Sequence, residues 1–170
     1  MTEITEDWAA AFTLPEPGNM MENHANREQV FIRQGTRMAA TIRTCIETYT
    51  GRPITDQRIL DFGCGVGRVA MPLYHYFRKP DVCVDVDAAA IRYLRPQIPD
   101  AACRVTRFDP PLSFRDRAFD AVFSVSIWTH LNADSAEAWL AEIRRILKPG
   151  GYAFLTTSSY TMLQIRRSNM

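Results

Sequence analysis

The chain has 170 residues, a length typical of one domain of about 100 to 200 residues. Its residues are 46% hydrophobic and 23% charged, which excludes wholesale disorder and allows a sizeable core. The 20 lysines and arginines nearly balance the 19 aspartates and glutamates, giving a net charge of +1. The composition therefore offers no general basic surface, and we expect neither nucleic acid nor a membrane as a partner.

From the sequence, we expect neither a membrane-spanning segment nor a secretion signal. Its longest apolar stretch, Ala121–Trp128, is broken by two serines and is far shorter than the roughly 18 residues that a membrane helix needs. The first residues are acidic, unlike a signal peptide. The four cysteines have the spacing of neither a zinc site nor a disulfide framework: Cys45, Cys64, Cys83 and Cys103. We expect a cytoplasmic protein with reduced, mostly buried thiols and no metal.

The first 50 residues divide into an arm and a helix. Residues 1–28 are rich in acidic side chains, and Pro15 and Pro17 interrupt any helix there. We expect an arm outside the core, which could fold over a site as a lid and bring His24 to it. From Arg27 to Tyr49, apolar residues recur at intervals of three and four, which predicts an amphipathic helix.

From residue 51 onward, short apolar strands alternate with helices. The expected strands are 58–62, 81–85, 102–106, 118–126 and 152–157, and the expected helices are 66–77, 88–95 and 134–147. This alternation is typical of right-handed βαβ units, which build a parallel sheet covered by helices on both faces.

A glycine-rich turn follows the first expected strand. In Asp61-Phe-Gly63-Cys-Gly65-Val-Gly67, the glycines permit a tight turn and close approach of the backbone to a ligand. The spacing is not the Gly-x-Gly-x-x-Gly of dinucleotide sites, which disfavours a nicotinamide or flavin cofactor. Asp61 would repel a diphosphate but suits an ammonium or sulfonium group, such as that of S-adenosylmethionine. Asp85 ends the second strand, where a carboxylate can accept hydrogen bonds from ribose hydroxyls.

Four segments resemble the successive motifs of class I S-adenosylmethionine-dependent methyltransferases. They are Ile59-Leu-Asp-Phe-Gly-Cys-Gly-Val-Gly-Arg68, Val82-Cys-Val-Asp-Val-Asp87, Phe119-Asp-Ala-Val-Phe-Ser-Val-Ser126 and Leu147-Lys-Pro-Gly-Gly151. Their order and spacing match the family over residues 55–157. The resemblance implies a Rossmann-like α/β fold, with residues 51–170 as the methyltransferase domain and residues 1–50 as the N-terminal arm and helix.

The resemblance also implies S-adenosylmethionine as the cofactor and assigns residues to it. The methionine end is expected against Asp61 and the loop residues Gly63, Cys64, Gly65 and Gly67. Asp85 is expected to bind the ribose, and Val86 to pack on the adenine. The remaining contacts are expected from Phe108 and Asp109 at the edge of the adenine and from Ser126 and Ile127 beside the sulfonium.

Two further segments bear on the methyl acceptor. Asp109-Pro-Pro-Leu112 resembles the Asp-Pro-Pro-Tyr motif of amino methyltransferases, but it precedes the fourth strand and has a leucine in place of the aromatic residue. We favour a rigid connection there over a nucleic-acid acceptor. Ser126-Ile-Trp-Thr-His-Leu131 resembles a Ser-Val-Phe-Thr-His-Leu segment of many small-molecule methyltransferases, which implies a small-molecule acceptor.

His130 is the candidate catalytic residue. A histidine can act as a general base near neutral pH. The alternative is a structural role at the junction between loop and helix. We favour the structural role because a sulfonium is already an activated methyl donor, and in-line positioning supplies much of the catalysis. On the N-terminal helix, Arg33 or Arg37 could pair with the cofactor carboxylate, although most helical arginines are solvated.

The family sheet ordinarily ends in an antiparallel hairpin that follows a further helix. Because few residues follow strand 152–157, we expect the sheet to end after its fifth strand, with that hairpin absent. The edge of the fifth strand would then be exposed and could support a homodimer. Three explanations stay open: a short enzyme, a fragment of a longer chain, or a protomer whose partner covers that edge. We favour a short or shortened enzyme that could dimerise there. The chief rival function is a non-catalytic cofactor-binding or partner subunit without a complete acceptor pocket.

Overall fold

The computed structural model describes residues 2–16, 27–157 and 162–166. Its centre is a six-stranded sheet with the order β3-β2-β1-β4-β5-β6. The strands are β1 (Ile59–Phe62), β2 (Val82–Asp85), β3 (Ala102–Val105), β4 (Phe119–Ser124), β5 (Leu147–Thr156) and β6 (Met162–Arg166). The helices are α1 (Arg27–Thr50), α2 (Ala70–Phe77), α3 (Ala88–Gln97) and α4 (Ala133–Ile146). Strands β1 to β5 pair in parallel, which confirms the predicted Rossmann-like α/β fold.

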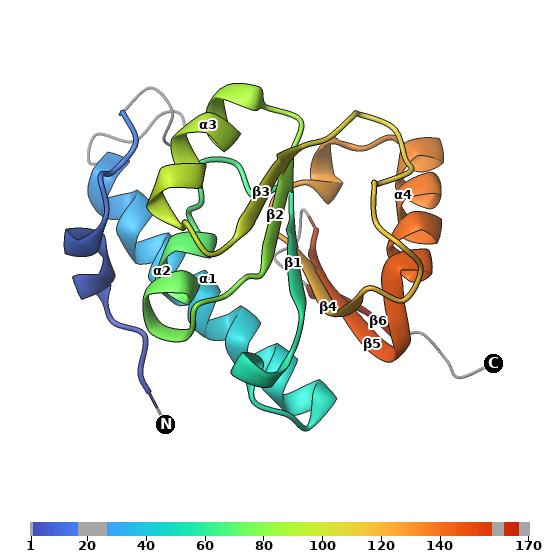
Figure 1. Ribbon diagram of the computed structural model, residues 1–170, viewed down its shortest axis with the longest axis horizontal. Helices are drawn as coiled ribbons and strands as arrows, with labels where there is room; N and C mark the ends of the chain where they lie inside the picture. Colours follow the sequence, from blue (N-terminus) through green and yellow to red (C-terminus); the bar gives the residue numbers. More distant parts are fainter. Residues whose placement is uncertain (1, 17–26, 158–161, 167–170) are drawn as a thin grey trace.

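The two faces of the sheet are covered by different helices (Figure 1). Helices α1, α2 and α3 lie on one side and α4 on the other. Successive strand residues point to opposite faces, so Ile59 packs in the cluster with Ile42 of α1, whereas Leu60 packs in the cluster with Trp139 of α4. All four residues of β1 are buried, as expected for a central parallel strand.

Helix α2 begins at Ala70, later than the predicted start at residue 66. The glycine turn occupies the intervening residues, and Gly67 has a φ of +84°, which no residue in a right-handed helix adopts. Pro72 lies in the first turn of α2, where its missing N–H removes no helical hydrogen bond.

The expectation that the sheet ends after the fifth strand is wrong. Strand β6 pairs antiparallel with β5, with Ala153 opposite Ile165 and Leu155 opposite Leu163. The prediction failed because we looked for a helix before the hairpin, whereas antiparallel strands need only a short connection. Since β6 covers the edge of β5, the predicted exposed edge is also wrong, and a homodimer through that edge loses its structural basis.

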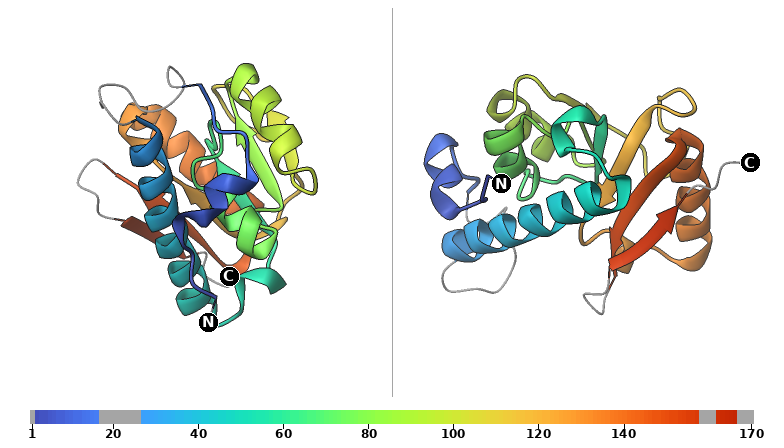
Figure 2. Two further views of the ribbon diagram at one scale, coloured as in Figure 1. Left: turned by 90° about the vertical axis from the view of Figure 1, so that its left-hand side faces the viewer. Right: turned by 90° about the horizontal axis from the view of Figure 1, so that it is seen from below.

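The prediction that the acidic N-terminal segment lies outside the core is wrong for its described part. A short 3-10 helix, η1 (Glu6–Ala11), packs against α1 and α2 (Figure 2). The Trp8 side chain of η1 is fully buried. The indole N–H of Trp8 donates to Thr36 Oγ1 at 2.9 Å, and the Thr13 N–H donates to Gln97 Oε1 at 3.2 Å. The prediction failed because it rested on the acidic composition of the segment, whereas its one large apolar side chain, Trp8, is buried against the helices. His24 lies outside the described residues.

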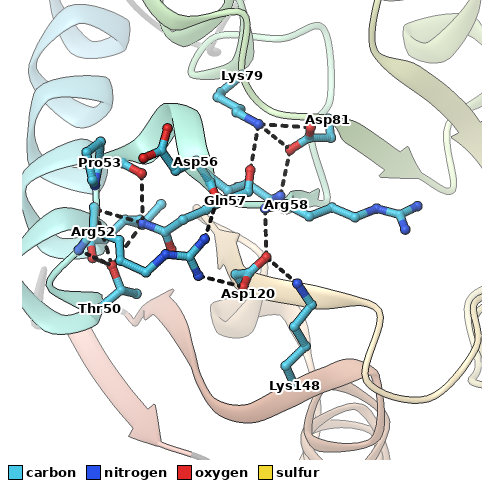
Figure 3. A network of polar contacts seen from close by, with 12 residues as sticks. Thr50, Arg52, Pro53, Asp56, Gln57, Arg58, Lys79, Asp81, Asp120 and Lys148 are labelled. Atoms are coloured by element: carbon cyan, nitrogen blue, oxygen red, sulfur yellow. Dashed lines mark hydrogen bonds and ion pairs between the residues drawn. The ribbon is translucent and has the colours of Figure 1, made fainter.

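Two aspartates, each in an ion pair with a lysine, hold the amino end of β1 in place (Figure 3). Asp120 Oδ2 accepts from the Arg58 N–H at 2.9 Å and from Lys148 Nζ at 2.6 Å. Asp81 Oδ2 accepts from the Ile59 N–H at 2.7 Å, and Lys79 Nζ donates to Asp81 Oδ1 at 2.9 Å. These contacts fix the start of β1 against β2 and β4, and hence the position of the loop at its other end.

Within the described ranges, no helix is both long and apolar enough to cross a membrane. The cytoplasmic location stays a prediction.

Candidate functional site

A cavity of about 490 Å³ opens at the carboxyl ends of β1, β2 and β4, the end at which parallel α/β sheets bind ligands. Its size lies within the range of about 300 to 1,000 Å³ of small-molecule sites. Seven of the predicted cofactor residues line it: Asp61, Gly63, Cys64, Gly65, Asp85, Ser126 and Ile127. The sequence thus located the cavity and much of its wall.

The glycine turn closes tightly around the end of β2. The N–H groups of Gly63 and Cys64 both donate to the Val84 carbonyl, at 2.9 and 3.1 Å. Gly63 has a φ of +76°, and a Cβ there would lie 2.3 Å from Ile127 Cγ1. The turn therefore requires glycine at this position for both its backbone conformation and its close approach to the loop after β4.

Asp85 connects the glycine turn to the start of α3. Its Oδ2 accepts from the Gly65 N–H at 2.6 Å, and its Oδ1 accepts from the Asp87 N–H at 2.9 Å. The Asp87 carboxylate then caps α3, because its Oδ1 accepts from the Ala89 N–H at 2.7 Å. Each carboxylate oxygen of Asp85 keeps a second lone pair that can accept from a ligand hydroxyl.

Asp61 is the most deeply buried carboxylate of the cavity wall, with a residue exposure of 3%. Burial raises its pKa well above the usual range, and the negative charge of Asp85 adds to this effect. The guanidinium of Arg68 acts in the opposite direction. A buried carboxylate with a raised pKa, at a cavity wall, is a feature of functional sites and favours a cationic ligand group.

Sequence reasoning missed several residues of the cavity, including Phe31, Arg68 and Tyr93. Arg68 immediately follows the last glycine of the turn, and this position in the sequence could have indicated that it lies near the cavity. The two arginines that we had considered for the cofactor carboxylate, Arg33 and Arg37, are exposed on α1 and do not line the cavity.

Five predicted residues lie outside the cavity wall: Gly67, Val86, Phe108, Asp109 and His130. Gly67 lets the turn pack closely against α3, since a Cβ there would lie 2.3 Å from Leu94 Cδ1. The Phe108 carbonyl accepts from the Trp139 indole N–H at 3.0 Å, and the Leu112 N–H donates to Glu142 Oε1 at 2.7 Å. These bonds anchor the proline segment to α4, as expected of a rigid connection.

The His130 side chain is exposed in η4 (Trp128–His130), the short 3-10 helix before α4. Its backbone N–H donates to the Ile127 carbonyl at 2.9 Å. His130 thus lies at the junction between loop and helix, and the choice between a structural role and a general base stays a prediction.

Three of the four cysteines lie together: Cys64 of the glycine turn, Cys83 of β2 and Cys103 of β3. Cys64, Cys83 and Cys103 are buried free thiols, and Cys45 is partly buried. Burial contributes to a raised pKa of about 11 for Cys64, although the neighbouring Cys83 thiol opposes the rise. Protonated, buried thiols are poor nucleophiles, so Cys64 contributes packing to the cavity wall.

The fold is a Rossmann-like α/β domain, and its cavity lies at the carboxyl ends of the parallel strands. Residues 60–155, more than half of the chain, match the family model described as "Methyltransferase domain". The chain therefore belongs to this methyltransferase family. Family membership implies S-adenosylmethionine as the cofactor, and the cavity fits it: Asp61 suits a cationic group, and Asp85 suits ribose hydroxyls.

Individual relatives differ in the acceptors that their names give. A tRNA N(3)-cytidine methyltransferase of Mus musculus is 28% identical over 131 residues, which cover 71% of this chain and 33% of the relative. A sterol 24-C-methyltransferase of Neurospora crassa is 32% identical over 114 residues, covering 62% of this chain and 30% of the relative. The structure of an S-adenosylmethionine-dependent methyltransferase from Methanosarcina mazei is 26% identical, with a TM-score of 0.56, and the match covers 65% of this chain and 55% of that one. The chain spans about a third of the length of the two curated relatives.

Proposed function

We propose that this chain binds S-adenosylmethionine in the cavity at the carboxyl ends of β1, β2 and β4, and that it transfers the methyl group to a small-molecule acceptor. The observation that carries this proposal is the pair of carboxylates in one cavity, Asp61 deeply buried and Asp85 at the end of β2. The first suits the ammonium of the cofactor, and the second suits the ribose. Membership of the methyltransferase family supports the assignment.

The remaining contacts follow the shape of the cavity. Ser126 and Ile127 would run past the sulfonium, because they line the cavity on the side of β4. Val86, Phe108 and Asp109 would close over the adenine, which fits the large exposed fractions of Val86 (38%) and Phe108 (79%). An aromatic ring this exposed has apolar surface to bury against a ligand.

Methyl transfer here requires positioning more than proton transfer. The sulfonium supplies an activated methyl group, so the protein has to hold donor and acceptor in line and exclude water. The turn at Gly63 and the loop at Ile127 would set the direction of approach, since they lie so close that a Cβ at Gly63 would be 2.3 Å from Ile127 Cγ1. His130 would act through the structure of η4, with no proton transfer of its own.

The described N-terminal elements, residues 2–16 and α1, would form one wall of the site. Phe31 of α1 lines the cavity, and its ring centroid lies 6.4 Å from that of the buried Trp8. The Tyr93 side chain, also in the cavity wall, donates to the carbonyl of Thr13. A lid function would therefore involve this segment directly.

The near-neutral charge of the chain supports the small-molecule acceptor, because tRNA binding draws much of its free energy from basic surfaces. The tRNA-modifying relative favours RNA as the second candidate. The test is incubation with methyl-labelled S-adenosylmethionine and either a small-metabolite extract or total tRNA, with Asp85→Ala as the matched control.

We expect label in the small-molecule fraction that depends on Asp85. Label in tRNA would overturn the small-molecule acceptor and identify RNA as the substrate class. Absence of label from both fractions, in a protein that binds S-adenosylhomocysteine, would favour the non-catalytic alternative.

A further inference from the structure

A second cavity, of about 550 Å³, lies against β2 and β3 on the face of the sheet that carries α4. Val84 of β2 lines it and packs in the same cluster as Trp139 of α4. Arg104 of β3 lies opposite Val84 in register and also lines the cavity. Successive strand residues face opposite sides, so β2 separates this cavity from the one that Asp85 lines. No described residue lines both cavities.

The outer wall of the second cavity is the connection between β3 and β4. These residues, 106–118, form neither a helix nor a strand, and they run beside α4 (Figure 1). The buried Glu142 of α4 accepts from the Leu112 N–H at 2.7 Å, and Arg145 donates to the Phe114 carbonyl at 2.9 Å. Arg145 and Glu142 also form an ion pair at 2.7 Å. The wall is thus held to α4 by paired charges, and the cavity is preformed.

Two arginines give the second cavity a positive charge. Arg104 and Arg107 line it, and none of its described lining residues is acidic. Within the described ranges, neither arginine takes part in an ion pair. The Arg104 guanidinium lies 4.0 to 6.0 Å class distance above the Phe114 ring, at 5.3 Å from its centroid. Such stacking orients a guanidinium and leaves the N–H donors in its plane available to a ligand.

The other lining groups indicate which anion fits. Thr106 and Ser113 contribute hydroxyl groups, and the buried Val84 and Leu112 contribute apolar surface. A guanidinium matches the oxygens of a phosphate group in a two-bond geometry, and a phosphate monoester carries about 1.5 to 2 negative charges near neutral pH. Two arginines therefore suit one phosphate, whereas the apolar surface suits an organic part of the same molecule.

We propose that the second cavity binds a small phosphorylated molecule. Its phosphate group binds Arg104 and Arg107, and its organic part packs against Leu112 and Phe114. The site shares no described residue with the cofactor cavity, so the proposal goes beyond the proposed function and does not depend on it.

The test is calorimetric titration with two probes, inorganic phosphate and phenyl phosphate, in a buffer that contains no phosphate. We expect phenyl phosphate to bind about 10-fold or more tightly than inorganic phosphate, because its ring buries apolar surface. Saturation with S-adenosylhomocysteine should change neither affinity by more than about twofold, because the two cavities are separate.

Substitutions of the two arginines test the site directly. Arg104→Met and Arg107→Met should each weaken the binding of phenyl phosphate about 10-fold or more, through loss of a charge-assisted hydrogen bond. Arg37→Met is the matched control, since it removes the same charge from an exposed position of α1 outside the cavity, and it should change the affinity by less than about twofold. Phe114→Leu should reduce the preference for phenyl phosphate. Circular dichroism shows that each variant is folded.

Three results would overturn the proposal: no binding of phenyl phosphate to the folded wild type at millimolar concentration, equal losses in Arg104→Met and Arg37→Met, or displacement of phenyl phosphate by S-adenosylhomocysteine. The second result would indicate a general charge effect, and the third would place the phosphate in the cofactor cavity. Equal affinities for the two probes would contradict an organic ligand and identify inorganic phosphate as the occupant.

Discussion

The two ends of strand β1 use aspartates in opposite ways. At the amino end, partial burial acts against ionisation of Asp120, but hydrogen bonds from Lys148, Arg58 and Arg52 outweigh it and lower the pKa. At the carboxyl end, burial and the charge of Asp85 raise the pKa of Asp61 well above its usual range. A paired carboxylate stabilises the fold, whereas a buried one with a raised pKa costs stability.

This difference distinguishes a structural network from a binding site. The groups that satisfy Asp120 come from the chain itself: one backbone N–H, one lysine and one arginine. Asp61 lies at the wall of a cavity, where a ligand can supply the compensating positive charge. We infer that the buried Asp61 lowers the stability of the fold and serves to bind a ligand, as is common at functional sites.

The largest expected effect comes from the shape of the carboxyl end. Gly63→Ala adds a Cβ that would lie 2.3 Å from Ile127 Cγ1, at a φ of +76°. We expect displacement of the turn and a loss of about 100-fold or more in affinity for S-adenosylhomocysteine, or about 2.8 kcal/mol. The measurement is calorimetric titration of protein shown to be folded by circular dichroism.

Gly51→Ala is the matched control near the amino end. Gly51 has a similar φ of +67°, but a Cβ added there would meet nothing within 4 Å beyond its chain neighbours. This variant should lose about 1 to 2 kcal/mol of stability from backbone strain and keep its affinity. Equal losses of affinity in the two variants would contradict the role of the Gly63 contact.

Asp61→Asn should separate binding from stability. It removes a buried ionisable group, so we expect the Tm at neutral pH to rise by about 2 to 4 °C. The affinity for S-adenosylhomocysteine should fall about 10- to 100-fold, because the ammonium loses its charged partner. Differential scanning calorimetry and ligand titration measure the two effects.

The pH dependence of this Tm difference follows from the raised pKa of Asp61. The native state holds the proton more tightly than the unfolded state, so the wild type loses stability as pH rises from the unfolded carboxyl pKa, about 4, to the native pKa. The advantage of Asp61→Asn should therefore grow across this window and shrink toward acid. A constant or inverted difference would show that Asp61 is not destabilised by burial.

Asp120→Ala should lower the stability of the fold and leave ligand affinity unchanged, the opposite of what we expect for Asp61→Asn. It removes the acceptor for the Arg58 N–H and for two cations, and we expect a loss of about 1.5 to 3 kcal/mol in the free energy of unfolding. Both cations are about half exposed, with side-chain exposures of 50% for Arg52 and 43% for Lys148, so their ion pairs contribute less than the backbone bond. Urea unfolding measures the loss, and the affinity of the folded protein for S-adenosylhomocysteine should stay unchanged.

The smallest effect is expected for His130→Ala. The side chain is exposed and lies outside the cavity wall, so affinity for S-adenosylhomocysteine should change by less than about twofold. Once an acceptor is known, kcat should also stay within about tenfold of the wild type. A fall of 100-fold or more, with unchanged KM, would instead indicate a general base.

Much of the fold could be predicted from the sequence because buried parallel strands are short runs of apolar residues, which can be recognised locally. Strand β1 is a run of buried residues before a glycine turn, and both features are visible without a structure. The same signal located Asp61 and Asp85, since each follows from its place at the end of a strand. Strand β6 gave no such signal, because it is a short strand added to an edge.

The cavity wall from α1 and η1 could not be predicted because it depends on packing between distant segments. Nothing near Phe31 or Trp8 in the sequence indicates that they meet beside the glycine turn. Arg68 belongs to the turn itself, but its direction is set by Gln34 on α1, a contact between residues 34 apart. Such contacts become visible only in the folded chain.

The most direct test of the account is calorimetric titration of the purified chain with S-adenosylhomocysteine. We predict one-to-one binding with a dissociation constant on the order of micromolar, and a rise in Tm with ligand concentration. A folded protein that shows neither heat of binding nor a shift in Tm would contradict the assignment of the cavity as the cofactor site.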